Sequence, residues 1–363
     1  MKLQQITRYI ETFAPLSLQE SYDNAGLLTG TPDQEISKAL ITLDVTREVM
    51  EEALETGANL IIAHHPLIFR GLKHLRGENL VEELVIKAIK NDIALYAAHT
   101  NLDRVAGGVN ARLSQKLGLK STRVLSPAGK LKKLVVFVPE THIDLVRNHM
   151  LNAGAGHIGN YSHCSFSAPG EGSFKALEGT HPFVGKQGEL HFEKEVRLET
   201  IVPENILQNV LQAMLAVHPY EEVAYDIYPL ENRGISVGDG MIGELQKPLP
   251  AMDFLYFVKE KLEAQNIRYG VPLDRLIRKV AVCGGSGSFL MEKAFAAQAD
   301  VFITADLKYH DFFLFQHQMM LVDAGHYETE QFTKALLFEK LTKKFPNFAL
   351  QISKHNTNPV SFL

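Results

Sequence analysis

The sequence predicts an α/β protein in which a two-part, mostly parallel α/β sheet domain is interrupted by a ferredoxin-like α+β insertion. Strand and helix patterns alternate in residues 1–126 and again in residues 233–363, an order that produces a parallel sheet covered by helices. Residues 127–232 have a different order and a glycine-rich centre. At 363 residues the chain is also too long for one ordinary core. We therefore expect the two outer segments to form one sheet system and the middle segment to form its own module.

In the first third, short apolar runs alternate with amphipathic patterns. Thr46 is a typical N-cap and Gly57 a typical stop for the first helix after a strand. The predicted elements are strand 38–43, helix 47–54, strand 60–63, helix 79–90, strand 93–98 and helix 108–117.

The last third repeats this alternation. Its glycine-rich segment 284–288 predicts a tight strand-to-helix turn near the site; we favour this over a phosphate cradle because no Gly-Lys-Ser/Thr follows. The predicted elements are strand 279–283, helix 291–298, strand 301–304, a helix near Phe312, strand 319–322, helix 327–344 and strand 349–352.

The middle segment has two βαβ-like repeats, which is typical of a ferredoxin-like module. The predicted elements are strand 131–139, helix 143–153, the glycine-rich stretch 154–188, strand 196–201, helix 204–217 and strand 223–228.

Composition excludes several classes of protein. The net charge of −5 and the lack of a basic block argue against a protein that holds nucleic acid mainly through phosphate contacts. The amino terminus lacks an apolar signal core, and no run reaches membrane-spanning length, so we expect a cytoplasmic protein without a membrane partner. The two cysteines, Cys164 and Cys283, are too few for a disulfide framework or a Cys-rich zinc site. A bound metal would therefore use His, Asp and Glu.

His64 and His65 follow the apolar run 60–63 directly. Neighbouring side chains diverge along an extended backbone, so two adjacent imidazoles suit two metal ions, one each, where the pleat relaxes at the strand end. A pair of partly buried, hydrogen-bonded loop histidines is the alternative, and this dipeptide alone does not decide between them.

Two more strand-like runs end in similar residues, one in the segment 99–103 and the other before His326 and Glu330. Strand carboxyl ends share one edge of an open sheet, and two helical residues four apart share one face. This repetition favours a metal site. Asp306 and His310 follow a fourth run, 301–304, at the same predicted edge and are candidates for moving protons or orienting the ligands, unless they belong to a solvated helix start.

Several of these segments resemble the signatures of the Nif-three-like family, whose bacterial members are often labelled GTP cyclohydrolase 1 type 2 homologues. The matching segments occur in order in both outer thirds: 22–27, 43–46, 64–69, 100–103, 284–287, 303–306 with His310, and 325–330. Tyr22 stands where the family more often has tryptophan. The middle segment is similar to the insertion of longer family members, which resembles PII signalling and copper-tolerance ferredoxin-like trimers.

The resemblance implies a dinuclear metal centre inside a homohexameric toroid. Carried over onto this sequence, the ligands would be His64, His65, Asp103, His326 and Glu330. These residues suit two divalent ions per chain, as zinc, iron or manganese, and leave coordination positions open for water or substrate. We expect Glu330 to bridge the ions, with His65 and Asp103 on one and His64 and His326 on the other.

Two functions remain as hypotheses. The first is a metal-dependent hydrolase acting on GTP or another nucleotide or phosphorylated small molecule, with Asp306 or His310 moving protons. The second is a non-catalytic metal-binding or regulatory hexamer, in which the insertion senses a small molecule or docks a partner. The inserted module, which adds no evident catalytic group, is the feature that favours the second hypothesis.

Overall fold

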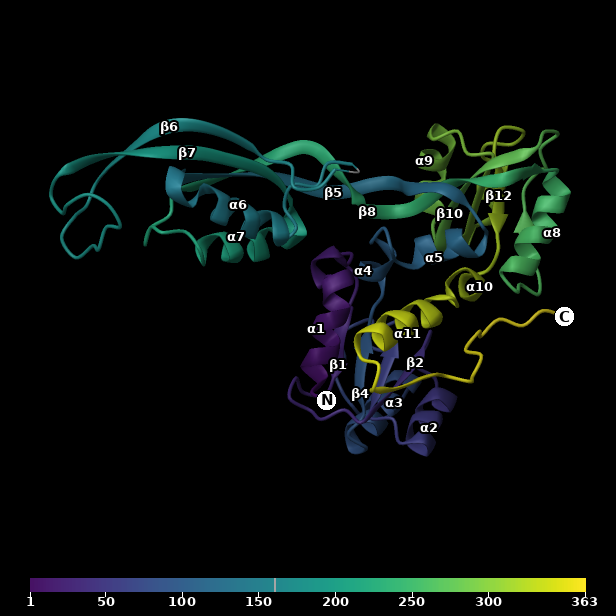
Figure 1. The fold of residues 1–363 in the computed structure, drawn as a ribbon. Coiled ribbons are helices and arrows are strands. Elements are labelled where there is room, and N and C mark those ends of the chain that lie inside the picture. The colour runs from purple at the N-terminus through teal and green to yellow at the C-terminus, as the bar shows by residue number, and fades with distance from the viewer. Residues whose placement is uncertain (160) are drawn as a thin grey trace. The chain divides into compact units, whose positions relative to one another are not determined.

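The computed structural model describes residues 1–159 and 161–363, and the chain forms two compact units (Figure 1). Unit 1 consists of Met1–Pro127 and Ser236–Leu363, and unit 2 of Ala128–Ile235. The chain passes between them through two long strands, β5 (Lys120–Pro139) and β8 (Tyr225–Leu249). The predicted fold class, a mixed α/β protein with a ferredoxin-like insertion, is confirmed.

The first sheet of unit 1 has the strand order β1-β4-β3-β2-β13. Strands β2, β3, β4 and β13 run parallel to one another, and β1 pairs antiparallel with β4. The strands are β1 (Gly26–Thr29), β2 (Lys38–Thr42), β3 (Leu60–Ala63), β4 (Ala94–Ala97) and β13 (Ala349–Ile352).

The second sheet continues from β8 in the order β8-β10-β11-β12-β9. The pairs β10–β11 and β11–β12 are parallel, whereas the β8–β10 and β12–β9 pairs are antiparallel. The strands are β9 (Arg268–Tyr269), β10 (Ile277–Ser286), β11 (Val301–Ala305) and β12 (Met320–Asp323). The outer thirds therefore form two sheets instead of the single system that the sequence suggested, because β1 and β13 already occupy both edges of the first sheet.

Alternating side chains place helices on both faces of the first sheet. Leu40 and Ile61 pack with α2 (Arg47–Thr56) and α3 (Leu80–Lys90). The next residue on each strand points to the other face, where α1 and α11 pack. The remaining helices of unit 1 are α1 (Leu3–Phe13), α4 (Thr100–Asp103), α5 (Val109–Lys116), α8 (Ala251–Lys261), α9 (Met291–Ala296), α10 (His326–Glu330) and α11 (Thr333–Lys344).

Local signals set the ends of these helices. The Thr46 hydroxyl accepts a hydrogen bond from the Val49 backbone at 3.3 Å, and Gly57 ends α2 at φ 69°, as the sequence predicted. The predicted helix 327–344 is instead two helices, α10 and α11, separated by a turn. The break has a packing reason, because α10 lies against β10 of the second sheet and α11 packs on the first.

Unit 2 has the element order β5, α6 (Ile143–Asn152), β6 (Phe166–Lys175), β7 (Leu190–Pro203), α7 (Leu207–Leu215) and β8. Its strand order, β6-β7-β5-β8, is that of a ferredoxin-like sheet. The two helices lie on one side of the sheet (Figure 1), where they bury a core that includes Val136 and Leu198. Strand β6 falls inside the stretch that the sequence treated only as glycine-rich.

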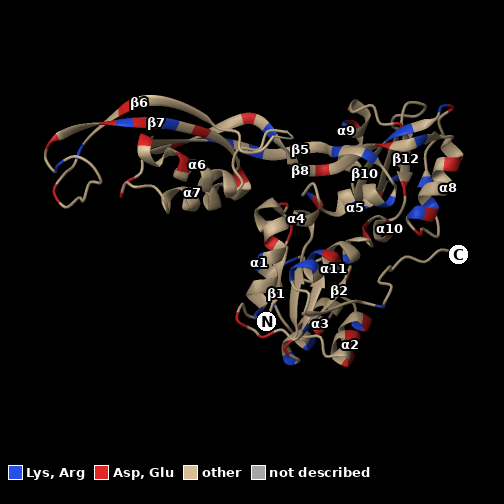
Figure 2. Cartoon of the chain, in the orientation of Figure 1, with Lys and Arg blue, Asp and Glu red and all other residues tan. Residues whose placement is uncertain are grey.

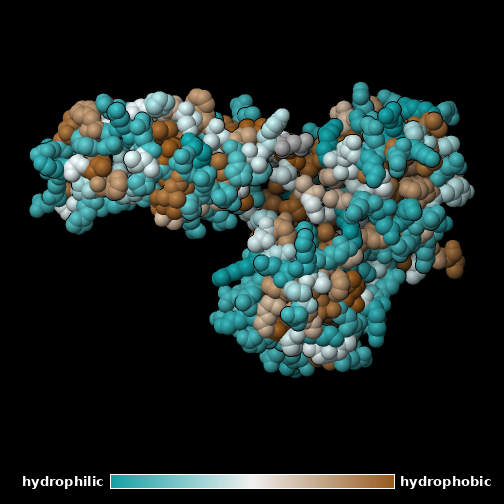
Figure 3. Space-filling model, in the orientation of Figure 1, coloured by the Kyte–Doolittle hydropathy of each residue, from teal (hydrophilic) through white to brown (hydrophobic). Residues whose placement is uncertain are grey.

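Polar and apolar surface is interspersed on unit 2. Acidic and basic residues follow one another along β7 (Figure 2), and apolar side chains are exposed on this unit's surface (Figure 3). The large exposed apolar side chains of unit 2 include Phe166, Leu177, Phe183, Leu190, Phe192 and Tyr228. Across residues 1–159 and 161–363, no helix has both the length and the apolar character needed to cross a membrane.

Candidate metal centre

The end of β3 turns two adjacent imidazoles toward one place. The backbone N–H groups of His64 and His65 both donate to the carbonyl of Leu43, at 3.1 and 3.0 Å, so the chain curls as soon as the strand ends. The two rings then lie 4.8 Å apart instead of on opposite faces. His64 is fully buried, and the His65 side chain is 23% exposed.

The short helix α10 brings two further side chains to this place. His326 and Glu330 lie one helical turn apart on the same face. The Glu330 Oε2 atom lies 2.9 Å from His65 Nε2, 3.2 Å from His326 Nε2 and 3.7 Å from His64 Nε2. Three imidazole nitrogens, two from the residues after β3 and one from α10, therefore converge on one buried carboxylate.

Each imidazole is oriented through its other nitrogen. His64 Nδ1 donates to the carbonyl of Ala98 at 2.7 Å. His65 Nδ1 is 2.7 Å from Asp44 Oδ1, and His326 Nδ1 is 2.7 Å from Asp306 Oδ2. These bonds leave the Nε2 atom of each ring to face Glu330, which is how metal-ligating histidines are usually held.

Two buried atoms at the cluster lack hydrogen-bond partners among the described residues: His64 Nε2 and Asp103 Oδ1. They lie 3.6 Å apart. Burying a polar atom without a partner costs free energy, so such atoms in a native site call for a bound group. A divalent cation satisfies an imidazole nitrogen and a carboxylate oxygen together, and the residues present therefore fit the implied metal.

The cluster also sets the charge of its members. Burial lowers the pKa of His64, so its imidazole is neutral. Burial opposes protonation of His65 and His326 too, but hydrogen-bonded carboxylates outweigh it and raise their pKa to about 10 and about 9. Burial, then repulsion by Glu330, raises the pKa of Asp103. For Glu330 itself, the facing imidazoles overcome burial and hold its pKa well below the ordinary value.

The glycine-rich end of β10, where the register with β11 shifts, makes room for this carboxylate. Gly285 has φ +59°, and a Cβ built on it would lie 2.2 Å from Glu330 Oε1 and 3.0 Å from His326 Nε2. Both the backbone conformation and the close approach therefore require glycine. The glycine-rich segment therefore lies near the site as expected, but residues 284–286 are the end of β10, and only Gly287 separates this strand from the 3-10 helix η4 (Ser288–Leu290).

The cluster opens into a cavity of about 490 Å³ that lies entirely within unit 1. Its lining includes three exposed aromatic side chains, Tyr22, Phe69 and Phe289. Cys283 also lines it, but burial, then the nearby carboxylates, raises the pKa of its thiol, which makes the thiol a poor ligand.

His99 lines the same cavity, with its ring centroid 5.4 Å from those of both His64 and His65. Its Nδ1 is 2.7 Å from Asp23 Oδ1, and Thr100 donates to the other oxygen of Asp23. Burial disfavours the Asp23 carboxylate, but the bonds from His99 and Thr100 outweigh it and lower its pKa to about 2. His99 is therefore a third imidazole held by a carboxylate at this site.

The residues proposed as proton-transfer groups lie in different places. Asp306 contacts His326 and so orients a candidate ligand. His310 lies on the exposed 3-10 turn η5 (Tyr309–Phe313), between aromatic rings, and is not part of the described cavity lining. The sequence reasoning assigned no role to Asp44 or His99. Only their position in the sequence could have pointed to a role at this site, because Asp44 follows β2 and His99 follows β4 at the same sheet edge as His64.

The chain matches the family described as Duf34/NIF3 (NGG1p interacting factor 3) over residues 1–359. A GTP cyclohydrolase 1 type 2 homolog of Bacillus subtilis (strain 168) is 45% identical over 371 residues, covering 99% of this chain and 98% of that protein. A second protein of that name, from Listeria innocua serovar 6a, is 36% identical over 366 residues, with coverage of 99% and 98%.

Two solved structures are similar over the whole chain. A Bacillus cereus protein related to NIF3 superposes with a TM-score of 0.88 at 42% identity, covering 100% of this chain and 99% of that one. The Staphylococcus aureus protein SA1388 has a TM-score of 0.78 at 29% identity, with the same coverage.

Proposed function

Because the chain belongs to the Duf34/NIF3 family, we propose that it holds divalent metal ions at the His64–His65–Glu330 cluster and acts as a metal-dependent hydrolase. The observation that carries the proposal is a pair of buried atoms, His64 Nε2 and Asp103 Oδ1, that have no hydrogen-bond partner among the described residues. His64 is one of the three imidazoles that converge on Glu330. This cluster opens into a cavity large enough for a small substrate.

We propose two ions per chain, held by His64, His65, Asp103, His326 and Glu330. The distances favour a pairing that differs from the one expected from sequence. His64 Nε2 lies 3.6 Å from Asp103, and the His65 and His326 rings are 5.3 Å apart, with Glu330 available to both pairs. An imidazole-rich set with two carboxylates suits zinc, iron or manganese.

When bound, such ions polarise a substrate oxygen and lower the pKa of water. The chain's own residues supply orientation and proton transfer. Asp44 and Asp306 fix two of the ligand rings through their Nδ1 atoms. His99, with Nδ1 bonded to Asp23, keeps Nε2 as the atom that can accept a proton at the cavity wall. The proton-transfer roles expected for Asp306 and His310 stay predictions.

The cavity favours a small molecule with a planar ring. Tyr22 and Phe69 lie with ring centroids 6.2 Å apart at its rim, where a purine base can stack. Arg104 is the basic side chain among the described lining residues, and it is paired with Glu20 at 3.0 Å and Asp239 at 3.2 Å. Because Arg104 is already paired, the aromatic pair and the names of the relatives, and not a free basic side chain, make GTP or another nucleotide the substrate class to test first.

The test is a hydrolysis screen of the metal-loaded protein on GTP, other nucleotides and phosphodiesters, with metal content measured in parallel. Glu330→Gln should lower metal content toward one ion or none and reduce turnover by at least about 100-fold. Glu328→Gln is the matched control, because Glu328 is buried on the same helix but bonds to Asn358. Two ions retained at full occupancy by Glu330→Gln, or turnover that persists in this variant, would contradict the proposal.

The second candidate is a non-catalytic metal-binding or regulatory assembly. Unit 2 supports it, because this unit has its own core and its own cavity. Full metal occupancy without turnover on any substrate of the screen would favour this function over hydrolysis.

We further propose a cytoplasmic homohexamer. The resemblance suggested this assembly, and exposed apolar side chains on β9 and η5 of unit 1, including Tyr269, Tyr309 and Phe313, supply surface that a subunit contact would cover. Light scattering on the intact protein should give about six times 40.5 kDa, and a stable monomer at micromolar concentration would refute the assembly.

A further inference from the structure

Unit 2 contains a cavity of about 740 Å³ on the face of its sheet that the helices leave uncovered. Residues paired across β5, β6 and β7 share this face, including Phe137 opposite Arg197 and Gly170 opposite Glu195. The loop after β6 and the segment 220–224 complete the walls. The backbone N–H of His181 in that loop donates to Glu221 at 2.9 Å, which ties the two walls together.

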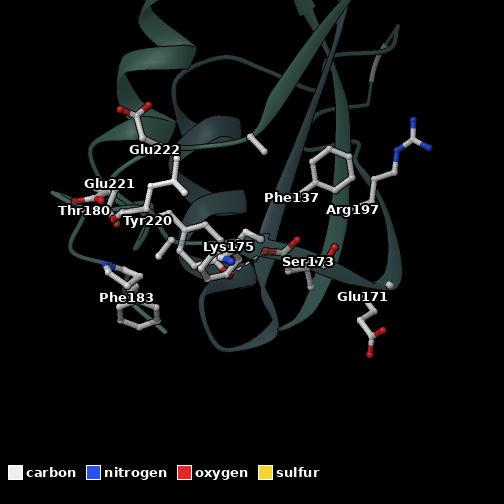
Figure 4. A pocket seen from close by; sticks show the side chains of 18 of the residues that line it. Phe137, Glu171, Ser173, Lys175, Thr180, Phe183, Arg197, Tyr220, Glu221 and Glu222 are labelled. Carbon is white, nitrogen blue, oxygen red and sulfur yellow. Dashed lines mark hydrogen bonds between the residues drawn. The ribbon is translucent and has the colours of Figure 1, made fainter. Parts of the chain in front are cut away.

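Aromatic side chains form much of the wall. Figure 4 shows Phe137, Phe183 and Tyr220 around the cavity, and Phe174 also lines it. The Tyr220 ring lies 6.2 Å from that of Phe174 and 6.3 Å from that of Phe183. A ring face attracts a cation that lies within about 6 Å of its centroid, and several rings around one space can form a cage for an ammonium group.

One carboxylate is fixed inside this wall. Glu195 Oε1 accepts a hydrogen bond from the Tyr220 hydroxyl at 2.9 Å. A Cβ built on Gly172 would lie 2.2 Å from Glu195 Oε2, so glycine at this position of β6 leaves the carboxylate its observed place, and a larger residue would make it shift. The site therefore combines a held negative charge with an aromatic surround.

The remaining charges of the lining also favour a cation. Acidic side chains outnumber basic ones, with Glu171, Glu195, Glu221 and Glu222 against Lys175 and Arg197. The Arg197 guanidinium is paired with Glu199 at 3.5 Å, and Figure 4 shows it directed away from the aromatic rings. Lys175 has no ion-pair partner among the described residues, but it is a single positive charge against four carboxylates of the lining.

We propose that this cavity binds a small organic cation, with an aryl or alkyl group among the aromatic side chains and its ammonium group at Glu195. The cavity volume suits a ligand of drug-like size, and a charge-assisted hydrogen bond to a fixed carboxylate orients it. The site is separate from the metal centre and does not depend on its chemistry.

The test uses 2-phenylethylammonium as the probe, with neutral 2-phenylethanol and anionic phenylacetate as matched analogues, titrated into the full-length protein by calorimetry and saturation-transfer NMR. The cation should bind saturably and at least tenfold tighter than either analogue. Glu195→Gln should weaken it tenfold or more, whereas Glu193→Gln should not, because Glu193 lies on the same face of β7 but bonds to His191 outside the cavity.

Two further variants test whether a loss of binding reflects misfolding and whether the cavity holds something other than an organic cation. Lys175→Met should tighten cation binding, since it removes a competing positive charge, whereas a site for anions would lose affinity. Phe183→Ala should weaken binding of the probe without changing the oligomeric state. The proposal would be overturned if the three analogues bound equally or if the cation did not saturate the site up to about 10 mM. It would also be overturned if the Phe183→Ala oligomer dissociated, because a second copy of the chain would then fill the cavity.

Discussion

Groups outside the metal cluster determine which ring nitrogen of each cluster histidine carries the proton. Asp44 and Asp306 accept from Nδ1 of His65 and His326, so both rings present Nε2 to Glu330. A carboxylate that only orients a ligand should affect metal binding, whereas one that moves protons should affect turnover alone. This difference decides between two roles for Asp306.

Replacing Asp306 by Asn should lower metal affinity by about 10- to 100-fold, because the His326 ring loses the partner that fixes its tautomer. Titration of metal-free protein with Zn²⁺ or Mn²⁺ measures this. Asp311→Asn is the control, since Asp311 accepts from the backbone N–H of Lys308 on exposed η5 and has no contact with the cluster. Unchanged metal affinity together with lost turnover would instead support the proton-transfer role.

Metal binding should also release protons. Without metal, His65 and His326 have pKa values of about 10 and about 9, so both carry a proton at pH 7. Only the neutral rings bind a cation, and about two protons must leave. Apparent affinity should therefore rise with pH through neutrality and level off above about pH 10. Calorimetry in buffers of different ionisation enthalpy counts the protons, and a count of zero would contradict this charge assignment.

At the scale of elements, the sequence pointed to this centre because polar residues recur after several predicted strands. Polar residues follow β3 and β4 of one sheet and β11 and β12 of the other. The sequence placed them at the edge of one sheet, whereas the structure brings His64, Asp103 and Glu330 together from the ends of two sheets. The oriented pairs were not predictable in this way. Which carboxylate faces which ring, as Asp44 faces His65, depends on tertiary distances that no local pattern carries.

Strand β6 shows why part of the fold escaped prediction. Its residues Pro169, Gly170 and Gly172 have low strand propensity and are typical of loops. Pairing with β7 along its whole length overrides that preference. The same glycines leave space on the open face of the sheet, and Gly172 in particular leaves room for Glu195.

The glycine pair Gly284–Gly285 at the end of β10 gives a prediction at this scale. Gly285→Ala should cost about 1–2 kcal/mol for its left-handed backbone and should also displace Glu330, lowering metal content. Gly57→Ala separates the two effects, because Gly57 has φ +69° but its added Cβ would meet nothing within 4 Å. Thermal unfolding and metal analysis of both variants measure the difference. Equal metal content in the two would show that the close approach at Gly285 does not matter.

At the scale of the whole molecule, two compact units with separate cores carry two separate cavities. The metal cluster lies within unit 1, and the aromatic cavity lies within unit 2. A ligand stabilises the cooperative unit that binds it, by about 2.7 kcal/mol at a free concentration 100 times its Kd.

Calorimetric unfolding of the intact protein should therefore show two transitions that respond to different ligands. Zn²⁺ or Mn²⁺ should raise the midpoint of the unit 1 transition and leave the other unchanged, because each candidate ligand from His64 to Glu330 belongs to unit 1. Glu330→Gln should abolish the metal-dependent shift, whereas Glu195→Gln should retain it, since Glu195 lies in unit 2. A single transition that moves as a whole with metal would mean that the two units unfold as one.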